Sequence, residues 1–270
     1  LYQRMERMLA DHSADGGPHG LRGGEEVTVD YLRKLPRERW FDDFRVGEVF
    51  RLPSMDQDKL RVQLEGVLRG REHFDAALAG GTGMILALPH SGNWDMGGVA
   101  VVARYGRFTT VAERLKPESL YRRFLEFRES LGFEIVPLTG GDRPPMEVLA
   151  DRLRANGMIA LLADRDLTRR GVEVEFFGEQ TRMPAGPARL AVETGAPLHP
   201  THCWNTPDGW VVDILPALDT GSGDVATITQ ALADVFAERI AEHPQDWHML
   251  QPQWIADLSD ERRARLAEPS

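Results

Sequence analysis

A histidine and an aspartate, His90 and Asp95, stand five residues apart, just after an apolar run at residues 84–89. The short stretch SGN directly after the histidine consists of residue types that favour turns and helix caps. A carboxylate that reaches an imidazole fixes its tautomer and stabilises the imidazolium, so the other ring nitrogen can act as a general base. The pattern predicts acid–base chemistry at His90, although the same spacing also suits a capped helix start with a surface histidine.

Such a pair is suited to the activation of an alcohol. A sugar or glycerol hydroxyl is a poor nucleophile at neutral pH, and a histidine that removes its proton lets it attack an acyl carbonyl. A nearby backbone N–H or arginine would then stabilise the oxyanion, an effect that is typically worth a few kcal/mol. Because this scheme needs no covalent acyl-enzyme, we expect direct transfer of the acyl group.

The pair must be positioned by a strand before it and a helix after it. The apolar run before His90 predicts a buried strand, and residues 96–103 predict a helix. His90 should therefore lie at the carboxyl end of a strand and face the amino end of a helix. That is where open α/β sheets have their ligand crevice.

Strands and helices are predicted to alternate along the rest of the chain. Apolar runs predict strands at residues 108–112, 133–137, 158–163, 197–203 and 210–215, and a strand or an extended arm at 172–177. Helical spacing is found at residues 119–131, 145–155, 184–194 and 228–242, and in a charged tail from 259. The alternation predicts the α/β class, with a mostly parallel central sheet flanked by helices.

Polar groups that could do chemistry are also predicted at three other strand ends. Glu113 and Arg114 follow one strand, where they either contribute to a site or form a solvated ion pair. Residues 164–166, DRD, follow another, and their aspartates either join the site or cap the next turn. His202 lies in an apolar context that favours a buried, hydrogen-bonded side chain over a ligand contact.

The composition limits the class of protein. The chain has 270 residues and a formal net charge of −10, which argues against nucleic-acid binding because that needs a basic footprint. The single cysteine, Cys203, leaves no internal disulfide or cysteine-based metal site and favours a cytoplasmic location. No apolar run approaches the ~18 residues that span a bilayer, and no signal peptide is recognised. The sequence also lacks a serine-hydrolase elbow, a phosphate-loop lysine and metal-ligand spacing, so no metal is expected.

The N-terminal part has a different pattern. Between residues 27 and 50, basic side chains interleave with aromatic ones at helical spacing. A basic amphipathic surface of this kind is typical of membrane-interface elements, and the alternative is a helix pair that packs on the main sheet. We therefore predict a helical segment at residues 1–50, for which membrane contact and packing on the main sheet are both open, followed by a single α/β domain at 51–270.

The segment HSGNWD, residues 90–95, resembles the HxxxxD motif of the glycerolipid and lysophospholipid acyltransferase superfamily, in the form shared with bacterial late acyltransferases of lipid A synthesis. The resemblance covers roughly residues 51–266. Other similar segments are AERLK (112–116), FRESLG (127–132), ADRD (163–166), VEFFG (174–178) and MPAGPARLA (183–191). The segments most similar to the branch that acylates phosphatidylinositol mannosides are VAERLKPESLYRR (111–123) and DWHMLQPQW (246–254).

This resemblance implies a glycerol-3-phosphate acyltransferase-like fold and a peripheral enzyme on the cytoplasmic face of the inner membrane. The enzyme would transfer a long acyl chain, typically palmitoyl, from acyl-CoA as co-substrate to a mannose hydroxyl of a phosphatidylinositol mannoside, without a further cofactor. By motif match, His90 is the base, Asp95 its helix partner and Asp164 an acid near the histidine. The residues expected to bind substrate in the polar site are Glu113, Arg114, Arg128 and Arg165.

Some alternatives stay open at this point. Either Asp95 or Asp164 could hold the working imidazole. A lipid A precursor would be the acceptor in a neighbouring branch, and water in place of the alcohol would make the protein a thioesterase or hydrolase. A lipid-binding protein without catalytic activity is a further alternative.

Overall fold

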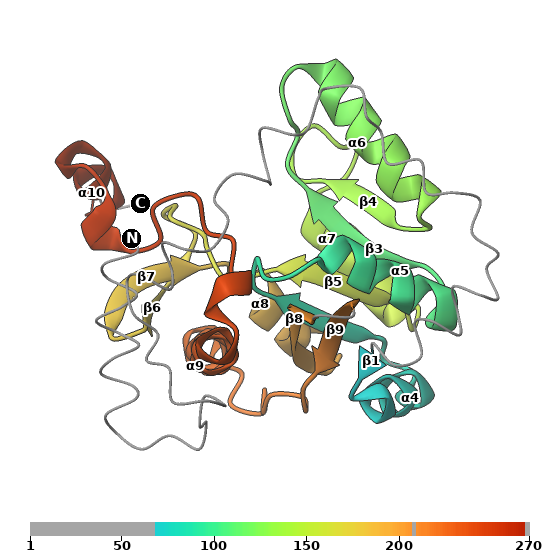
Figure 1. The fold of residues 1–270 in the computed structure, drawn as a ribbon. Coiled ribbons are helices and arrows are strands. Elements are labelled where there is room, and N and C mark those ends of the chain that lie inside the picture. Colours follow the sequence, from blue (N-terminus) through green and yellow to red (C-terminus); the bar gives the residue numbers. More distant parts are fainter. Residues whose placement is uncertain (1–67, 207–208, 268–270) are drawn as a thin grey trace.

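A computed structural model describes residues 68–206 and 209–267 (Figure 1). The strands are β1 (Leu68–Arg69), β2 (Met84–Leu88), β3 (Phe108–Ala112), β4 (Glu134–Pro137), β5 (Met158–Leu162), β6 (Val172–Phe176), β7 (Glu179–Met183), β8 (Leu198–Thr206) and β9 (Gly209–Ile214). The α-helices are α4 (Arg71–Gly80), α5 (Trp94–Tyr105), α6 (Glu118–Ser130), α7 (Pro145–Arg154), α8 (Gly186–Thr194), α9 (Val225–Glu242) and α10 (Asp260–Ala267), and the short 3-10 helices are η1 (Pro244–Asp246) and η2 (Ile255–Asp257). The predicted segment at residues 1–50 lies outside the described residues, so its relation to a membrane stays a prediction.

The central sheet has seven strands in the order β1-β9-β8-β2-β5-β3-β4. β2 pairs in parallel with β5 and β8, and β3 pairs in parallel with β5 and β4. β9 runs antiparallel to β8 and parallel to β1. The predicted α/β fold with a mostly parallel sheet is confirmed. Because five neighbouring strands run the same way, the carboxyl ends of β2, β3, β4, β5 and β8 lie at one edge of the sheet.

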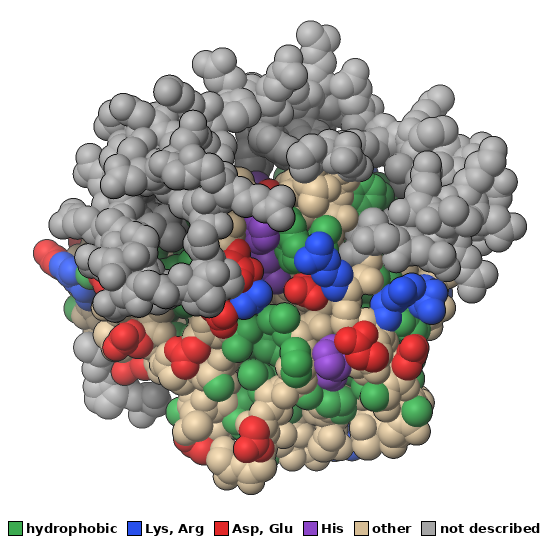
Figure 2. Space-filling model, turned by 60° about the horizontal axis from the view of Figure 1, so that its bottom comes forward, with side chains coloured by type: hydrophobic (Ala, Val, Ile, Leu, Met, Phe, Trp, Pro, Cys, Tyr) green, Lys and Arg blue, Asp and Glu red, His purple; other side chains and the backbone are tan. Residues whose placement is uncertain are grey.

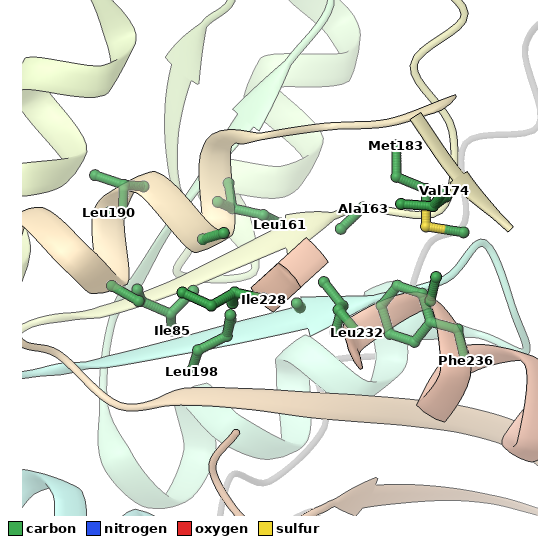
Figure 3. Close-up of a cluster of buried hydrophobic side chains, with 14 of the residues drawn as sticks. Ile85, Leu161, Ala163, Val174, Met183, Leu190, Leu198, Ile228, Leu232 and Phe236 are labelled. Atoms are coloured by element: carbon green, nitrogen blue, oxygen red, sulfur yellow. The ribbon is translucent and has the colours of Figure 1, made fainter. Parts of the chain in front are cut away.

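β2 is buried on both faces because helices cover both sides of the sheet (Figure 1). Ile85 and Ala87 pack in a hydrophobic cluster with side chains of α7, α8 and α9, part of which Figure 3 shows. Met84, Leu86 and Leu88 point the other way, into a cluster with α4 and α5. Full burial of an aliphatic side chain contributes about 1.5–3 kcal/mol. A continuous apolar run is therefore what a strand covered on both faces requires.

α5 begins beside the loop that carries His90. The side chain of Asn93 caps the helix by accepting a hydrogen bond from the Met96 backbone N–H at 3.1 Å. Gly98 lets the helix approach the sheet closely, because a Cβ at this position would lie 2.6 Å from the ring of Phe133. The cap and the glycine together fix the amino end of α5 next to the loop.

β6 and β7 form a separate antiparallel hairpin, with Val172 opposite Met183. Of the two alternatives for residues 172–177, the strand is therefore the one observed. The hairpin is joined to α9 by a hydrogen bond from the Glu175 backbone N–H to Gln230 Oε1 at 2.9 Å. β7 itself was not predicted, since its sequence EQTRM shows no strong apolar alternation even though Thr181 is buried.

Among the described residues, no helix is both long and apolar enough to cross a membrane. Figure 2 shows one face of the molecule, on which acidic and basic side chains are interspersed with hydrophobic ones. The charges on this face are thus mixed in sign, and the absence of nucleic-acid binding stays a prediction from the net charge.

Candidate active site

The register of two paired strands brings His90 and Asp164 together. β2 and β5 run parallel with Leu88 opposite Leu162. His90 and Asp164 each lie two residues beyond that pair, so they are neighbours as well. The Nδ1 atom of His90 lies 2.6 Å from Oδ1 of Asp164. The backbone N–H of His90 donates to the second carboxylate oxygen, Oδ2, at 2.9 Å. One carboxylate therefore holds both the ring and the backbone of the histidine.

The two members of this pair differ in their exposure. The side chain of Asp164 is fully buried, whereas that of His90 is 42% exposed. A buried carboxylate needs hydrogen-bond donors, and the indole N–H of Trp247 supplies a further one to Oδ2 at 3.0 Å. When Nδ1 donates its proton to Asp164, the lone pair on Nε2 of His90 is left to accept a proton from a substrate.

The pKa of His90 lies above its ordinary value of 6.5. Burial by itself lowers this pKa, but the hydrogen bond and the negative charge of Asp164 together outweigh burial and the opposing charge of Arg165. The neutral imidazole is therefore a stronger base than an unperturbed histidine. The geometry suits a general base that is oriented by a buried carboxylate.

Asp95 does not hold the imidazole. Its carboxylate accepts hydrogen bonds from Arg128, from Nε at 3.0 Å and from Nη2 at 3.3 Å. The expectation that Asp95 folds back onto His90 is thus corrected, because the first turn of α5 directs this side chain towards α6. Of the two carboxylates left open by the sequence, Asp164 is the one that binds the imidazole.

Arg128 is buried and was expected to bind substrate. Its side chain is 8% exposed, and the guanidinium packs against the rings of Trp94 at 4.2 Å and Phe124 at 4.1 Å. With Nε and Nη2 directed at Asp95, the contacts of Arg128 join α5 to α6. Direct contact between Arg128 and a substrate stays a prediction.

Glu113 and Arg114 follow β3 at the same edge of the sheet as His90, and both are exposed. Arg114 pairs with Glu118, with Nε–Oε2 and Nη2–Oε1 distances of 3.0 and 2.9 Å. This arginine therefore pairs with the first residue of α6, and the alternative of a Glu113–Arg114 ion pair is wrong. The proximity of both residues to the sheet edge keeps their predicted role in substrate binding open.

The residues after Asp164 have separate roles. The Nε of Arg165 donates to the carbonyl of Pro252 at 2.7 Å. Asp166 caps the next turn through Oδ1, which accepts from the Thr168 backbone N–H at 3.2 Å. The turn-cap alternative is therefore correct for Asp166, whereas Asp164 belongs to the histidine.

His202 was expected at a strand end, but it lies inside β8. It is buried, as predicted, but within the described part of the chain neither ring nitrogen has a hydrogen-bond partner. Its ring stacks with those of Trp204 and His243, at centroid distances of 5.8 and 6.1 Å. Burial, together with smaller contributions from His243 and Arg239, lowers the pKa of His202 to about 3. Its site role is not supported.

Sequence reasoning assigned no role to residues 246–254, which we call the strap. The backbone N–H of His248 donates to the carbonyl of His90 at 2.7 Å. The Nε2 of Gln253 donates to the backbone carbonyl of Asp164 at 2.7 Å. The strap therefore contacts both members of the pair, and two tryptophans in a short polar segment were the signal that could have found it.

A metal site was not expected, and the described residues contain no group of three or more His, Cys, Asp or Glu side chains that could hold a metal ion. The pair can work without one, because a neutral imidazole with an oriented ring can deprotonate a hydroxyl. The site thus places an oriented imidazole at the carboxyl edge of a parallel sheet, close before a helix.

Comparison with known proteins identifies the class. A sequence model described as bacterial lipid A biosynthesis acyltransferase matches residues 43–256. The chain therefore belongs to this acyltransferase family, as the HSGNWD segment and the ordered motifs after it had suggested. The family and the fold expected from the sequence resemblance are both confirmed.

Two relatives within this family carry a name that also specifies the lipid acceptor. The chain is 68% identical over 219 residues to the phosphatidylinositol mannoside acyltransferase of Mycobacterium tuberculosis (strain H37Rv), a match that covers 81% of this chain and 69% of the relative. It is also 68% identical over 219 residues to the protein of the same name in Mycolicibacterium smegmatis, covering 81% of this chain and 71% of that one.

Proposed function

We propose that the protein transfers a long fatty acyl chain, such as palmitoyl, from acyl-CoA to a mannose hydroxyl of a phosphatidylinositol mannoside. The observation that carries the proposal is the His90–Asp164 pair at 2.6 Å, which presents an oriented base. The acceptor is proposed from the name of the relatives, which are 68% identical to this chain. The donor is proposed from the chemistry, because a thioester is an acyl donor that an alkoxide-like oxygen attacks readily.

In the proposed reaction, Nε2 of His90 removes the proton of the mannose hydroxyl as its oxygen attacks the thioester carbonyl carbon. The C–O bond forms, and the carbonyl oxygen becomes an oxyanion, which nearby N–H groups or an arginine stabilise. The intermediate collapses with cleavage of the C–S bond. The imidazolium returns the proton to the departing sulfur, so the products are the acylated mannoside and CoA. No acyl-enzyme forms, because the base acts on the acceptor.

Asp164 holds Nδ1 of His90, so the ring presents Nε2 and the imidazolium that forms is stabilised by a buried negative charge. Asp95 acts at a distance through Arg128, which ties the amino end of α5 to α6. Glu113, Arg114 and Arg165 are proposed to bind polar groups of the lipid headgroup or of CoA. Because the acceptor is a membrane lipid and the donor is water-soluble, we place the reaction at the cytoplasmic face of the inner membrane.

Hydrolysis by the same base is the second candidate, since water could take the place of the mannose hydroxyl. The two are separated by incubating the protein with palmitoyl-CoA, with and without a mannosylated phosphatidylinositol in detergent micelles, and measuring free CoA. CoA release that depends on the mannosylated acceptor supports transfer. Equal release without an acceptor would make the protein a thioesterase, and release that needs a lipid A precursor would change the acceptor. No release with any acceptor would leave lipid binding alone.

A further inference from the structure

We propose that Trp247 is a positioning residue of this reaction, whose indole N–H holds the Asp164 carboxylate in the orientation that binds the imidazole of His90. The inference deepens the proposed function and rests on it, because it concerns the base of that reaction. Trp247 comes from the strap, 83 residues along the chain from Asp164. Its role could not be assigned without the sheet register that places Asp164 beside the base.

The two oxygens of Asp164 have different partners. Oδ2 accepts two N–H groups, the indole N–H of Trp247 at 3.0 Å and the backbone N–H of His90 at 2.9 Å. Oδ1 is thereby left for Nδ1 of the same histidine, at 2.6 Å. A carboxylate rotates readily about its last side-chain torsion. Two donors on one oxygen fix the carboxylate plane, and so decide which oxygen the imidazole meets.

Trp247 is itself held rigidly. Its side chain is buried, and its ring packs edge-on against Phe176 and Trp254 with centroid distances of 5.8 and 6.4 Å. Its backbone forms an antiparallel bridge with Ser91, the residue after the base. The donor is therefore fixed both to the aromatic cluster and to the loop that carries His90. A preorganised donor of this kind orients a group without reordering during the reaction.

A buried indole N–H needs an acceptor of some kind, and the strap provides a direct comparison. Trp254 is also buried, and its N–H donates to the backbone carbonyl of Phe176 at 2.9 Å. The two tryptophans share residue type, segment and burial, but differ in acceptor. Only in the case of Trp247 does the acceptor belong to the pair. Trp254 is therefore the matched control for every effect of removing an indole from this segment.

The test compares Trp247→Phe with Trp254→Phe in the full chain. The first readout is the pKa of His90 without substrate, measured by NMR titration of the histidine rings, with the His90 signal assigned by its loss in His90→Gln. We expect the pKa to fall in Trp247→Phe, because a loosened Asp164 raises it less while burial still lowers it. We expect kcat for acyl transfer to fall about 10-fold or more with little change in KM, as for one lost hydrogen bond to a charged group. Trp254→Phe keeps an aromatic ring beside Trp247 and leaves the indole donor to Asp164 in place, so it should change both quantities much less than Trp247→Phe does.

Phenylalanine leaves space that could weaken folding, so a second variant carries 3-benzothienylalanine at position 247. This residue keeps the size of the ring system and replaces N–H by sulfur. The inference is overturned if both variants keep the wild-type pKa of His90 and lose no more kcat than Trp254→Phe. A rise of the pKa of His90 would also contradict the inference. It would mean that the indole weakens the effect of the Asp164 carboxylate on the imidazole instead of orienting the carboxylate. If the wild type transfers no acyl group, the proposed function fails, and the titration still reports the pair.

Discussion

Asp95 and Arg128 form a two-point ion pair that joins the first turn of α5 to the last turn of α6. The guanidinium also lies against the aromatic rings of Trp94 and Phe124. The aspartate of the HSGNWD segment thus fixes the helix that follows His90, while Asp164 binds the imidazole of His90. Because the two carboxylates have different partners, we expect Asp95 to matter mainly for stability and Asp164 mainly for turnover.

Removing one member of the Asp95–Arg128 pair should destabilise the fold. Asp95→Ala leaves a largely buried guanidinium without its partner, and the expected loss in free energy of unfolding is about 3 kcal/mol. The double variant Asp95→Ala/Arg128→Met removes both charges and should recover at least about 1 kcal/mol relative to the sum of the single effects. Urea unfolding of the four proteins measures this coupling. Additive effects would show that the pair contributes nothing as a pair.

Asp164→Asn should reduce kcat more than Asp95→Asn does. Asparagine keeps the size of Asp164 but loses the negative charge that stabilises the imidazolium, so we expect a fall of about 100-fold or more. Asp95→Asn acts only through the position of α5, and a fall of about 10-fold is expected. Steady-state rates of acceptor-dependent CoA release measure both. The reverse order would return the role of imidazole partner to Asp95.

The wild-type kcat/KM should rise with pH along a limb whose midpoint lies above 6.5. The base must be neutral to accept a proton, and Asp164 raises the pKa of His90 in spite of burial. The same raised pKa contributes to folding stability below pH 6.5, and this contribution is lost as pH rises through the folded-state pKa. In Asp164→Asn the activity limb should move to lower pH. A pH–rate profile of both proteins measures this shift. A limb at the same pH in both would mean that it does not report the ionisation of His90 beside Asp164.

Many helices and strands of the fold can be predicted from local sequence patterns. The apolar run before His90 predicts β2, and residues 108–112 match β3 in full. The helix pattern at 119–131 likewise matches α6 to within one residue at each end. These elements are predictable because each buries a face whose periodicity appears in a short window.

The site was only half predictable. His90 follows from the end of an apolar run, but its partner depends on β5 lying next to β2, and strand order across a parallel sheet leaves no local signal. Spacing alone favoured Asp95, which is near in sequence, and only the motif resemblance indicated Asp164, which is 74 residues away. Trp247 was harder still, since nothing in its own segment indicates which buried group it binds.

Gly98→Ala should destabilise the protein. A Cβ at this position would lie 2.6 Å from Phe133 and 2.9 Å from Phe108, so α5 must move away from the sheet, at a cost of about 1–3 kcal/mol. Gly80→Ala is the control, because a Cβ there meets nothing within 4 Å and alanine favours a helix. Thermal unfolding should show a lower midpoint for the first variant and an equal or higher one for the second. Equal loss in both would mean that the close approach of α5 has no energetic role.

The central claim is that His90 is the base of an acyl transfer, and His90→Ala tests it most directly. The measurement is acceptor-dependent CoA release from palmitoyl-CoA with a mannosylated phosphatidylinositol, alongside circular dichroism to verify the fold. His73→Ala serves as the control, because His73 lies on α4 and packs its ring against His199. We predict that His90→Ala lowers kcat by about 1000-fold or more with an unchanged fold, while His73→Ala keeps the wild-type rate. Wild-type turnover in a folded His90→Ala protein would contradict the mechanism.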